Sequence, residues 1–509
     1  MRRFQTLSTR KGISEVKLSH TLVVTSAVFD DPNLVSSGGL VPVLALAESA
    51  GLRDLADQHL TVPTDKGANA GLKVASLVAG MSVGADSIDD MAVLRHGGMG
   101  RVFTHAYAPS TLGSFLRSFA FGHVRQLDAV ASRFLTELAA VSPVTAGVGE
   151  LAILDVDDTV VEVHGYAKQG AGFGYNQVRG LNALIATVST PQAAPVIVAQ
   201  RLRKGSANSA RGAQRLVRDA LKTVRGLASA SQSASQSASQ SASQSASQSA
   251  SQSAGAASRS GRTLIRADSA FYGHAVIGAA VKTGAEVSVT IRLDPKVKAA
   301  IAAIDEDAWT TIAYPNAVFD EPTGRWISRA EVAEIDFVAF TSKKKADQVP
   351  GRLVVRRIPD LEPKTDASQA SLFQVWRHHA FFTTTPVEVA DTVAADKIHR
   401  GHAIIEQVHA DLKDSALAHL PSGKFNANAA WLVLAVMAFN LTRATGALGG
   451  PELARATTGT IRRKLINVPA RTATSARRLV LHLPQAWPWE HSWTRLFTAL
   501  SDPPPALAA

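Results

Sequence analysis

The stretch Leu151-Ala152-Ile153-Leu154-Asp155-Val156-Asp157-Asp158-Thr159 decides the fold class, because it is a short apolar run that ends in acids. Two more runs rich in Val, Ile and Leu follow at 181–188 and 195–200, and a glycine-rich stretch at 170–174 precedes them. Short apolar runs separated by turn residues are typical of strands. The sequence therefore predicts three consecutive antiparallel strands, with a helix over about 208–225 after them.

A second acid stands at the end of another strand-like run, Thr263-Leu264-Ile265-Arg266-Ala267-Asp268. A helix near 273–283 and a strand at 287–292 are expected next. An acid at the tip of a buried strand is costly unless it binds a cation or is solvated. A surface turn would explain either tip alone, but two such tips in one α/β region favour metal binding.

A third acid lies in the helical segment 399–413. His399, His402, Glu406 and Lys413 are three, four and seven positions apart, which predicts that they share one helix face. A phosphate-rich substrate would explain one carboxylate among basic groups, since the carboxylate takes metal and the bases take phosphate oxygens. An ordinary helix with salt bridges is the alternative.

Three carboxylates from two strand tips and a helix suit two-metal phosphoryl transfer. In that chemistry two Mg²⁺ ions about 3.5–4 Å apart activate the attacking oxygen and stabilise the leaving one. Carboxylates are ligands that Mg²⁺ prefers, and the mechanism needs no protein nucleophile. The chain has no cysteine, which excludes disulfides, zinc–thiolate sites and a cysteine nucleophile but leaves this chemistry open.

Composition and charge narrow the class of partner. The 509 residues suggest roughly three domains, and 46% hydrophobic with 19% charged residues is ordinary globular composition. With 53 Lys plus Arg against 42 Asp plus Glu, the net charge is +11 and the pI about 9.9, which favours a polyanionic partner over a neutral one. The apolar stretches near 22–29 and 429–439 are too short to span a membrane, and the second is expected to form a buried helix. We therefore expect a soluble cytoplasmic protein.

The rest of the chain divides by pattern. Apolar residues at helical spacing predict a mostly helical start, with helices at 40–50, 72–83 and 124–140. A Ser-Ala-Ser-Gln repeat occupies about 227–260, and its composition predicts a disordered or loosely helical tract. Residues 296–385 are expected to be β-rich, with strand candidates at 337–340, 353–357 and 373–383, and the chain beyond 396 is expected to be helical.

These motifs together resemble those of bacterial insertion-sequence transposases of the DDE class. One group of these carries its last acid in a Tyr-x2-Arg-x3-Glu-x6-Lys signature, which reads His399-x2-His402-x3-Glu406-x6-Lys413 here. Glutamate and lysine match, whereas histidine replaces both tyrosine and arginine. The family's Asp-x-Thr motif is matched by Asp157-Asp158-Thr159, and its second acid by Asp268.

The resemblance implies a fold and a division of the chain. The expected fold is an α/β RNase-H-like catalytic core, a mixed five-stranded sheet with flanking helices. The expected parts are a helical N-terminal DNA-binding domain (1–145), the first part of the core (146–295, with the 227–260 insert), a β-rich insertion (296–385), the final core helices carrying Glu406 (386–445) and a basic C-terminal region (446–509).

The resemblance also implies the chemistry. Asp157, Asp268 and Glu406 would hold Mg²⁺, for which Mn²⁺ could substitute, and Asp157 is preferred over Asp155 and Asp158 because it occupies the family position. The partners would be double-stranded DNA, as terminal inverted repeats and as target, and a second copy in a homodimer that pairs two element ends. Relatives pass through a DNA hairpin and stack a flipped base on an aromatic side chain, which makes Trp326 and Trp376 candidates. Because its partner would be chromosomal DNA, the resemblance also implies that the protein is associated with the nucleoid.

Basic residues are the expected DNA contacts. The segment 455–478 contains seven Lys or Arg residues and no acid, which fits either a solvated basic face or binding to the DNA backbone. The predicted DNA-binding residues, including those of the signature, are His399, Arg400, His402, Lys413, Arg462, Arg463 and Lys464.

Two other interpretations start from the same residues. Asp155 and Asp157 also fit the Asp-x-Asp-x-Thr opening of haloacid-dehalogenase-type phosphatases, as nucleophile and acid/base, but the later motifs of that class are missing and the 399–413 segment stays unexplained. The second is a relic that binds element ends without cutting them. In this interpretation the Ser-Ala-Ser-Gln tract, which lies between two of the predicted catalytic acids, disrupts the core.

Overall fold

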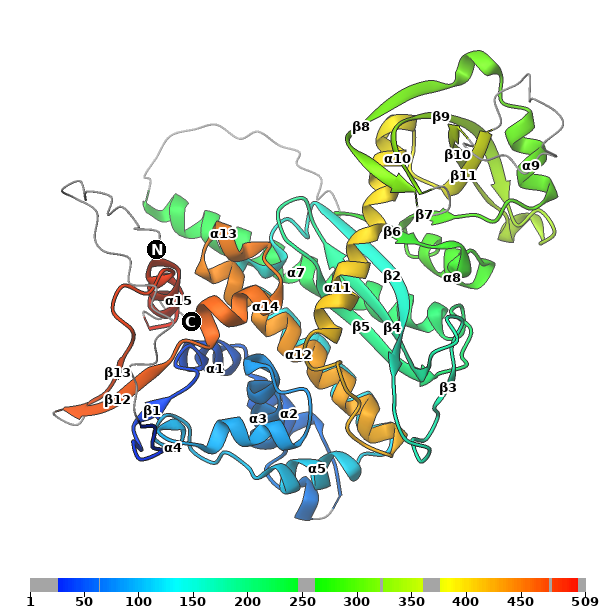
Figure 1. Cartoon of the computed structure of the whole chain (residues 1–509). Helices are drawn as coiled ribbons and strands as arrows, with labels where there is room; N and C mark the ends of the chain where they lie inside the picture. The colour runs from blue at the N-terminus through cyan, green and yellow to red at the C-terminus, as the bar shows by residue number, and fades with distance from the viewer. Residues whose placement is uncertain are drawn as a thin grey trace, which may run out of the picture.

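One large mixed sheet forms the centre of the molecule, with helices on both of its faces (Figure 1). The computed structural model describes residues 26–63, 65–245, 261–320, 324–359, 376–475 and 478–501. In these residues the sheet order is β3-β4-β2-β6-β7-β11-β10-β9-β8, and β5 also pairs with β4.

Five strands make the half of the sheet that carries the acids: β5 (Val196–Lys204), β4 (Arg179–Ser189), β2 (Leu151–Glu162), β6 (Arg262–Ala267) and β7 (Glu286–Thr290). β2, β4 and β5 are successive antiparallel strands, whereas β6 and β7 run parallel to β2. A short β3 (Gly172–Phe173) also pairs with β4. The three predicted antiparallel strands are confirmed, and the mixed sheet is compatible with an RNase-H-like core.

The predicted β-rich region continues the same sheet. Its strands are β8 (Thr310–Asp320), β9 (Arg325–Ala339), β10 (Val349–Pro359) and β11 (Trp376–Thr383). β11 pairs antiparallel with β7, so these strands extend the sheet from the edge of the acid-bearing half. The strand candidates are confirmed, apart from residues 373–375, which lie outside the described residues.

The N-terminal part is helical, as predicted, over most of its described residues. Its α-helices are α1 (Leu40–Ser49), α2 (Leu52–His59), α3 (Ala70–Val83), α4 (Met99–Val102), α5 (Pro109–Arg117) and α6 (Phe121–Ala140), with shorter turns η1 (Asp65–Gly67), η2 (Asp89–Arg95) and η3 (Pro143–Thr145). The exception is β1 (Leu34–Val35), which joins β12 (Ala470–Ser475) and β13 (Arg478–His482) in a three-stranded sheet. Segments from near the two ends of the chain therefore lie together.

A long apolar helix, α12 (Phe425–Gly449), passes between the N-terminal helices and the sheet (Figure 1). It packs against α6, α3 and β5, and the Asn440 side chain bonds both backbone groups of Ile197 in β5. By length and composition α12 could cross a membrane, but 89% of its most apolar window is buried inside the protein, as in a core helix. The predicted buried helix at 429–439 is confirmed.

The low-complexity tract is helical as far as residue 245, in line with one of the two predicted states. α7 (Ala213–Ser245) begins later than expected and continues as helix to residue 245, while 246–260 lie outside the described residues. The first half of α7 packs its apolar side chains, among them Leu216 and Val217, into the core. A helix nucleated in this way extends readily through alanine-rich sequence. After the tract, β6 pairs in register with β2, so the insert does not interrupt the sheet.

The remaining elements complete the two ends of the sheet and the C-terminal region. They are η4 (Ser269–Phe271), α8 (His274–Val281), α9 (Pro295–Ala302), η5 (Glu306–Ala308), η6 (Lys345–Asp347), α10 (Thr392–Arg400), η7 (Gly401–Ala403), α11 (Ile404–Lys413), α13 (Pro451–Ala454), α14 (Thr458–Ile461), the π-helical turn η8 (Arg462–Ile466) and α15 (Glu490–Ser501). α8 and β7 confirm the predicted helix near 273–283 and the strand after it.

Candidate active site

Strand geometry divides the three acids of β2 between the two faces of the sheet. Side chains alternate along a strand, so Asp155 and Asp157 share one face and Asp158 points to the other. The parallel register pairs Asp155 with Arg266 and Val156 with Ala267. Asp157 and Asp268 come next on their two segments, and Asp268 follows directly after β6. The neighbouring strands β2 and β6 thus present two acids at one level of the sheet.

Asp155 is fully buried and its charge is neutralised. Arg266 donates from Nε and Nη2 to the two carboxylate oxygens, at 2.7 Å each, and His402 Nδ1 lies 2.9 Å from Oδ1. A carboxylate held in this way has no free oxygen to attack a substrate. This arrangement argues against the phosphatase interpretation, in which Asp155 would be the nucleophile.

Asp158 is neutralised on the opposite face of the sheet. Its side chain is buried, and Arg203 Nη2 on β5 donates to Oδ2 at 2.9 Å. The Asn182 amide donates to the same oxygen. Arg203 also donates to backbone carbonyls of the turn before α7, including that of Ser209 at 2.8 Å. Asp158 therefore ties β2 to β5 and to the start of α7.

Asp157 has neither of the arginine partners that neutralise Asp155 and Asp158. Burial and the negative charge of nearby Asp268 raise the pKa of Asp157 to about 7, against the lowering effect of the Asp158 backbone N–H. Burial also raises the pKa of Asp268. His409 Nδ1 lies 3.8 Å from Asp157, but burial lowers the pKa of His409 to about 4, so its ring is neutral at pH 7. Across the described residues, neither acid forms an ion pair with Lys or Arg.

Glu406 lies in the first turn of α11, which packs against β2, and its side chain is exposed. Tyr175 lies in the loop after β3. Burial raises its pKa, and the charges of Asp158, Asp157, Asp268 and Glu406 raise it further.

The donor set suits a hard divalent cation, because it offers carboxylate oxygens whose repulsion a cation would relieve. However, the described residues contain no group of three or more His, Asp or Glu side chains in the arrangement of a ready-made metal centre. Mg²⁺ needs no such cage, since it is usually bound by one or two carboxylates together with waters and substrate phosphates. Asp157, Asp268 and Glu406 would be the residues to hold it.

The prediction of one regular helix face over 399–413 is wrong. α10 ends at Arg400, the 3-10 turn η7 follows, and α11 begins at Ile404. The tightened turn brings Gly401 against Arg266: a Cβ on Gly401 would lie 2.4 Å from Arg266 Nη1. This contact depends on a strand far away in the sequence, so helical spacing could not predict it.

His399 packs inside the protein. Its ring stacks on Phe381 with 4.0 Å between centroids, and its nitrogens lie 2.9 Å from Ser288 Oγ and 3.0 Å from Thr290 Oγ1. Burial lowers the pKa of His399 to about 3. Both ring nitrogens therefore lie within hydrogen-bonding distance of β7 hydroxyls, and a DNA contact by His399 stays a prediction.

The other predicted DNA contacts differ in their surroundings. Arg400 Nε donates to Asp396 at 2.8 Å. Arg462 is half-buried and donates to the Ser82 carbonyl at 3.2 Å, while Lys464 Nζ lies 5.0 Å from the centroid of Trp489. Lys413 and Arg463 are exposed. Their role in DNA binding stays a prediction.

The two candidate aromatic residues differ in exposure. Trp326 is 69% exposed and contacts Phe319 near the end of the β8–β9 pair. Trp376 is partly covered, since the Arg357 guanidinium lies 4.4 Å above its ring. Only Trp326 offers a free face to a base.

Three residues of this region were not singled out from the sequence. The sequence could have indicated two of them. His409 is three residues after Glu406, which is helical spacing, and Arg266 is two residues before Asp268, which is strand spacing. Nothing in the sequence indicates Tyr175, since only the tertiary fold brings its loop near the acids.

Comparison with protein families matches residues 22–505 to the family described as transposase DDE domain group 1. Comparison with curated proteins found no match. The family match spans nearly the whole chain and includes all three predicted acids with the strands and helices that carry them. DDE transposases are mobile-element enzymes that act on DNA and generally use divalent metal ions. The chain therefore belongs to the transposase DDE domain group 1 family and is a transposase of the DDE class.

Proposed function

We propose that this transposase binds the ends of an insertion sequence, cleaves DNA strands there and transfers them to target DNA in a metal-dependent reaction. Asp157, Asp268 and Glu406 would be its catalytic acids and metal ligands, on an RNase-H-like core. From the resemblance of the motifs we extend the proposal to a homodimer in the DNA complex and to a nucleoid-associated location.

The observation that carries the proposal is the selective pairing of the acids. Asp155 and Asp158 are buried and each is neutralised by an arginine, at 2.7 and 2.9 Å. Asp157 lies between them in sequence, beside Asp268, and pairs with neither arginine. Leaving a partly buried carboxylate unpaired is costly, and a bound cation is the usual compensation. A cation bound at Asp157 and Asp268 would relieve this cost, which supports the proposal.

The proposal gives each of these residues a separate role in the reaction. A divalent pair, when bound, would activate the attacking oxygen and stabilise the leaving one. Asp157 and Asp268 would hold cations from two adjacent segments of the sheet, and Glu406 would close the site from α11. His402 is fixed by Asp155, and Lys413 lies exposed at the end of α11, where its ammonium would meet the DNA backbone.

The test replaces each acid by its amide, as Asp157→Asn, Asp268→Asn and Glu406→Gln. We expect nicking of a plasmid that carries the element ends to fall by roughly a thousandfold in Mg²⁺ or Mn²⁺, because each variant loses a metal ligand. End binding in a gel-shift assay should stay within a few-fold of wild type. The matched controls are Asp54→Asn and Glu490→Gln, exposed acids on α2 and α15.

Two results would contradict the proposal. One is cleavage at wild-type rate by all three amide variants. The other is a wild-type protein that binds element ends but cuts them in neither Mg²⁺ nor Mn²⁺, which would identify it as an end-binding relic.

A further inference from the structure

The solvent face of α7 carries a row of basic side chains. Arg215, Arg218, Lys222 and Arg225 are three, four and three positions apart, which places them on one face of the helix, and Arg211 precedes them by four. All five are exposed. We call these five residues the α7 basic row.

The packing of α7 fixes the direction of the row. Leu216, Val217, Ala220 and Val224 on the opposite face are at most 2% exposed and belong to the main hydrophobic core. α7 therefore cannot rotate to bury its cations. The row stays in solvent whatever the conformation of the individual side chains.

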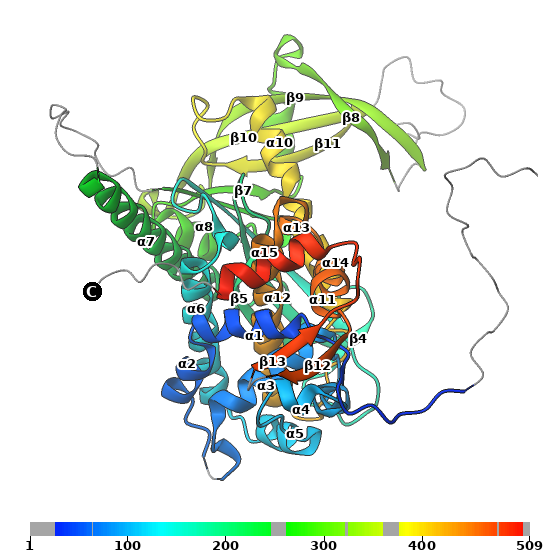
Figure 2. The same cartoon turned by 90° about the vertical axis from the view of Figure 1, so that its left-hand side faces the viewer.

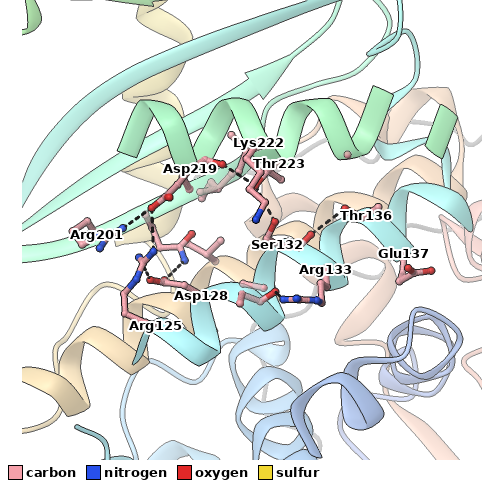
Figure 3. Close-up of a pocket in the computed structure, with 18 residues that line it drawn as sticks. Arg125, Asp128, Ser132, Arg133, Thr136, Glu137, Arg201, Asp219, Lys222 and Thr223 are labelled. Carbon is pink, nitrogen blue, oxygen red and sulfur yellow. Dashed lines mark hydrogen bonds and ion pairs between the residues drawn. The ribbon is translucent and has the colours of Figure 1, made fainter. Parts of the chain in front are cut away.

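The row has no acidic partner. The one acid among the described side chains of α7, Asp219, accepts from Arg125 Nη2 at 3.2 Å and from Arg201 Nη2 at 2.9 Å. Figure 3 shows Asp219 turned towards these two arginines in the groove between α6 and α7. No ion pair joins a member of the row to any acid that the structure describes. The cations of the row are thus not held in ion pairs within the described residues.

The groove itself adds a cation to the row. It is a pocket of 390 Å³ between α6, α7 and β5, and both Lys222 and Arg133 line it. Arg133 is exposed on α6, across the groove from Lys222. Asp128, a second partly buried acid there, accepts from Arg125 at 2.7 Å and from Gln200 at 2.9 Å, and the exposed acid Glu137 on α6 also lines the groove.

Such a row works against the helix that carries it. Like charges three or four residues apart repel each other, and cations in the first turns oppose the helix dipole. A solvated helix face normally mixes acids and bases, which avoids both effects. A polyanion along the row would remove the repulsion, so the pattern points to a ligand with regularly spaced negative charge.

The dimensions fit one strand of DNA. From Arg215 to Arg225 the helix rises roughly 15 Å, at 1.5 Å per residue. Over that length one strand of a duplex presents about four phosphates, at 3.4 Å each. The row offers four cations in the same span.

The position of α7 separates this surface from the catalytic acids. Figure 2 shows α7 on one side of the central sheet and α11, with Glu406, on the other. Figure 1 agrees, with α11 in front of the sheet and α7 behind it. DNA on α7 is therefore not the segment whose phosphate is cut.

We propose that the α7 basic row binds the backbone of a DNA duplex at a second surface of the transposase, away from the scissile phosphates. The inference rests on the proposed function, since it assumes a DNA substrate. The row would hold the DNA without reading its sequence, because phosphate contacts carry no sequence information.

The experiment measures the salt dependence of binding. Anisotropy of a labelled 40-base-pair duplex of mixed sequence is followed between 50 and 200 mM NaCl for wild type and for Arg215→Gln/Arg218→Gln/Lys222→Gln. The slope of log K against log salt is negative, and each lost phosphate contact reduces its magnitude by about 0.9. The slope of the triple variant should therefore be shallower by about 2.7. The affinity at low salt should fall roughly tenfold to a hundredfold.

The matched control is Lys343→Gln/Lys344→Gln/Lys345→Gln, which removes the same charge from an exposed run before β10. The control should keep the wild-type slope. An unchanged slope in the α7 variant, or an equal loss in the control, overturns the proposal, because binding would then depend on net charge alone. Circular dichroism melting shows whether each variant is folded.

Failure of this inference can be told apart from failure of the proposed function. If the row is not a DNA surface, the triple variant binds DNA as wild type does, while the amide variants of the acids still lose cleavage. If the protein is no nuclease, the acid variants change nothing, whatever α7 does.

Discussion

At the residue scale, the buried pair Asp155–Arg266 connects the three segments that carry the predicted catalytic acids. Asp155 is two residues before Asp157, and Arg266 is two residues before Asp268. Arg266 Nη1 also donates to the Ile398 carbonyl at 2.6 Å, and Asp155 holds His402, four residues before Glu406. The pair therefore sets how α11 sits on β2 and β6.

This geometry predicts that Asp155→Asn lowers end cleavage about a hundredfold or more while end binding changes little. The asparagine cannot balance Arg266 or hold His402, so Glu406 shifts relative to Asp157, and small misplacements of reacting groups cost about this much. The measurement is the rate of plasmid nicking beside a gel-shift titration.

Asp158→Asn is the matched control, since it breaks an equally buried aspartate–arginine pair on the other face of the same strand. Both variants should lose about 3–5 kcal/mol of stability. Equal loss of cleavage in both would mean that lower stability, and not positioning, causes the defect.

Two variants of His402 test the same contact. His402→Asn keeps a hydrogen-bond donor near the position of Nδ1, whereas His402→Gln does not. We therefore expect more cleavage from the asparagine variant.

His399 predicts a pH dependence of stability. Its pKa falls from 6.5 to about 3 on folding because its ring is buried. Below pH 6.5 His399 binds a proton in the unfolded chain but not in the folded chain. The free energy of unfolding therefore falls as the pH drops from about 6.5 towards 3, and His399 does not change it above pH 6.5. At pH 5 the loss is about 2 kcal/mol.

The measurement is urea unfolding at pH 7.5 and pH 5.0, for wild type and for His399→Asn. The variant is less stable at pH 7.5, because it loses the stacking on Phe381, but it should lose less stability between the two pH values than wild type does. A pH dependence identical in the two proteins would show that other groups, such as His409, cause all of it.

At the element scale, the strands were predictable and the break in the helix was not. The runs at 151–157, 181–188 and 263–268 carry their strand signal locally, in β-branched and apolar residues. The 3-10 turn at 401–403 has no such signal, since it follows from contact with Arg266 on β6. The same limit applies to the site. Arg203 and Arg266 lie on other strands, and their ion pairs with two acids of β2 leave Asp157 without an arginine partner.

The turn gives an element-scale prediction. In Gly401→Ala the new Cβ would approach Arg266 Nη1 to 2.4 Å, so η7 must move and carry α11 with it. The backbone of Gly401, at φ −61°, accepts alanine, which leaves the collision as the cause of any defect. We expect end cleavage to fall at least tenfold, with a destabilisation of about 1–3 kcal/mol. The measurements are plasmid nicking and thermal melting.

Gly122→Ala is the control for this change. Gly122 lies in the first turn of α6 with no atom within 4 Å of an added Cβ, and alanine favours helix. It should leave cleavage unchanged and stability equal or higher. Wild-type cleavage by Gly401→Ala would show that η7 does not position Glu406.

At the scale of the whole molecule, one hydrophobic cluster unites regions that the sequence predicts as separate domains. It contains buried residues of the N-terminal helices, of β2, β4 and β5, and of α12. α12 packs against α3, α6 and β5, and α6 also contacts β5 and α7 directly. The predicted boundary at residue 145 therefore crosses a continuous core, and the N-terminal helices support the helix that supports the sheet.

A continuous core predicts one cooperative unfolding transition for the N-terminal helices and the sheet. Leu127 on α6 is fully buried in this cluster. Leu127→Ala should cost about 2–5 kcal/mol and shift the whole transition down, with heat inactivation of cleavage following the same curve. The measurements are far-UV circular dichroism melting and the nicking activity that remains after heating. Val281→Ala is the control: Val281 is 39% exposed, so this variant should keep the wild-type melting temperature. If the N-terminal helices formed an independent domain, Leu127→Ala would instead split the melt into two steps and leave the inactivation temperature unchanged, because the acids' strands would no longer sense the cavity in α6.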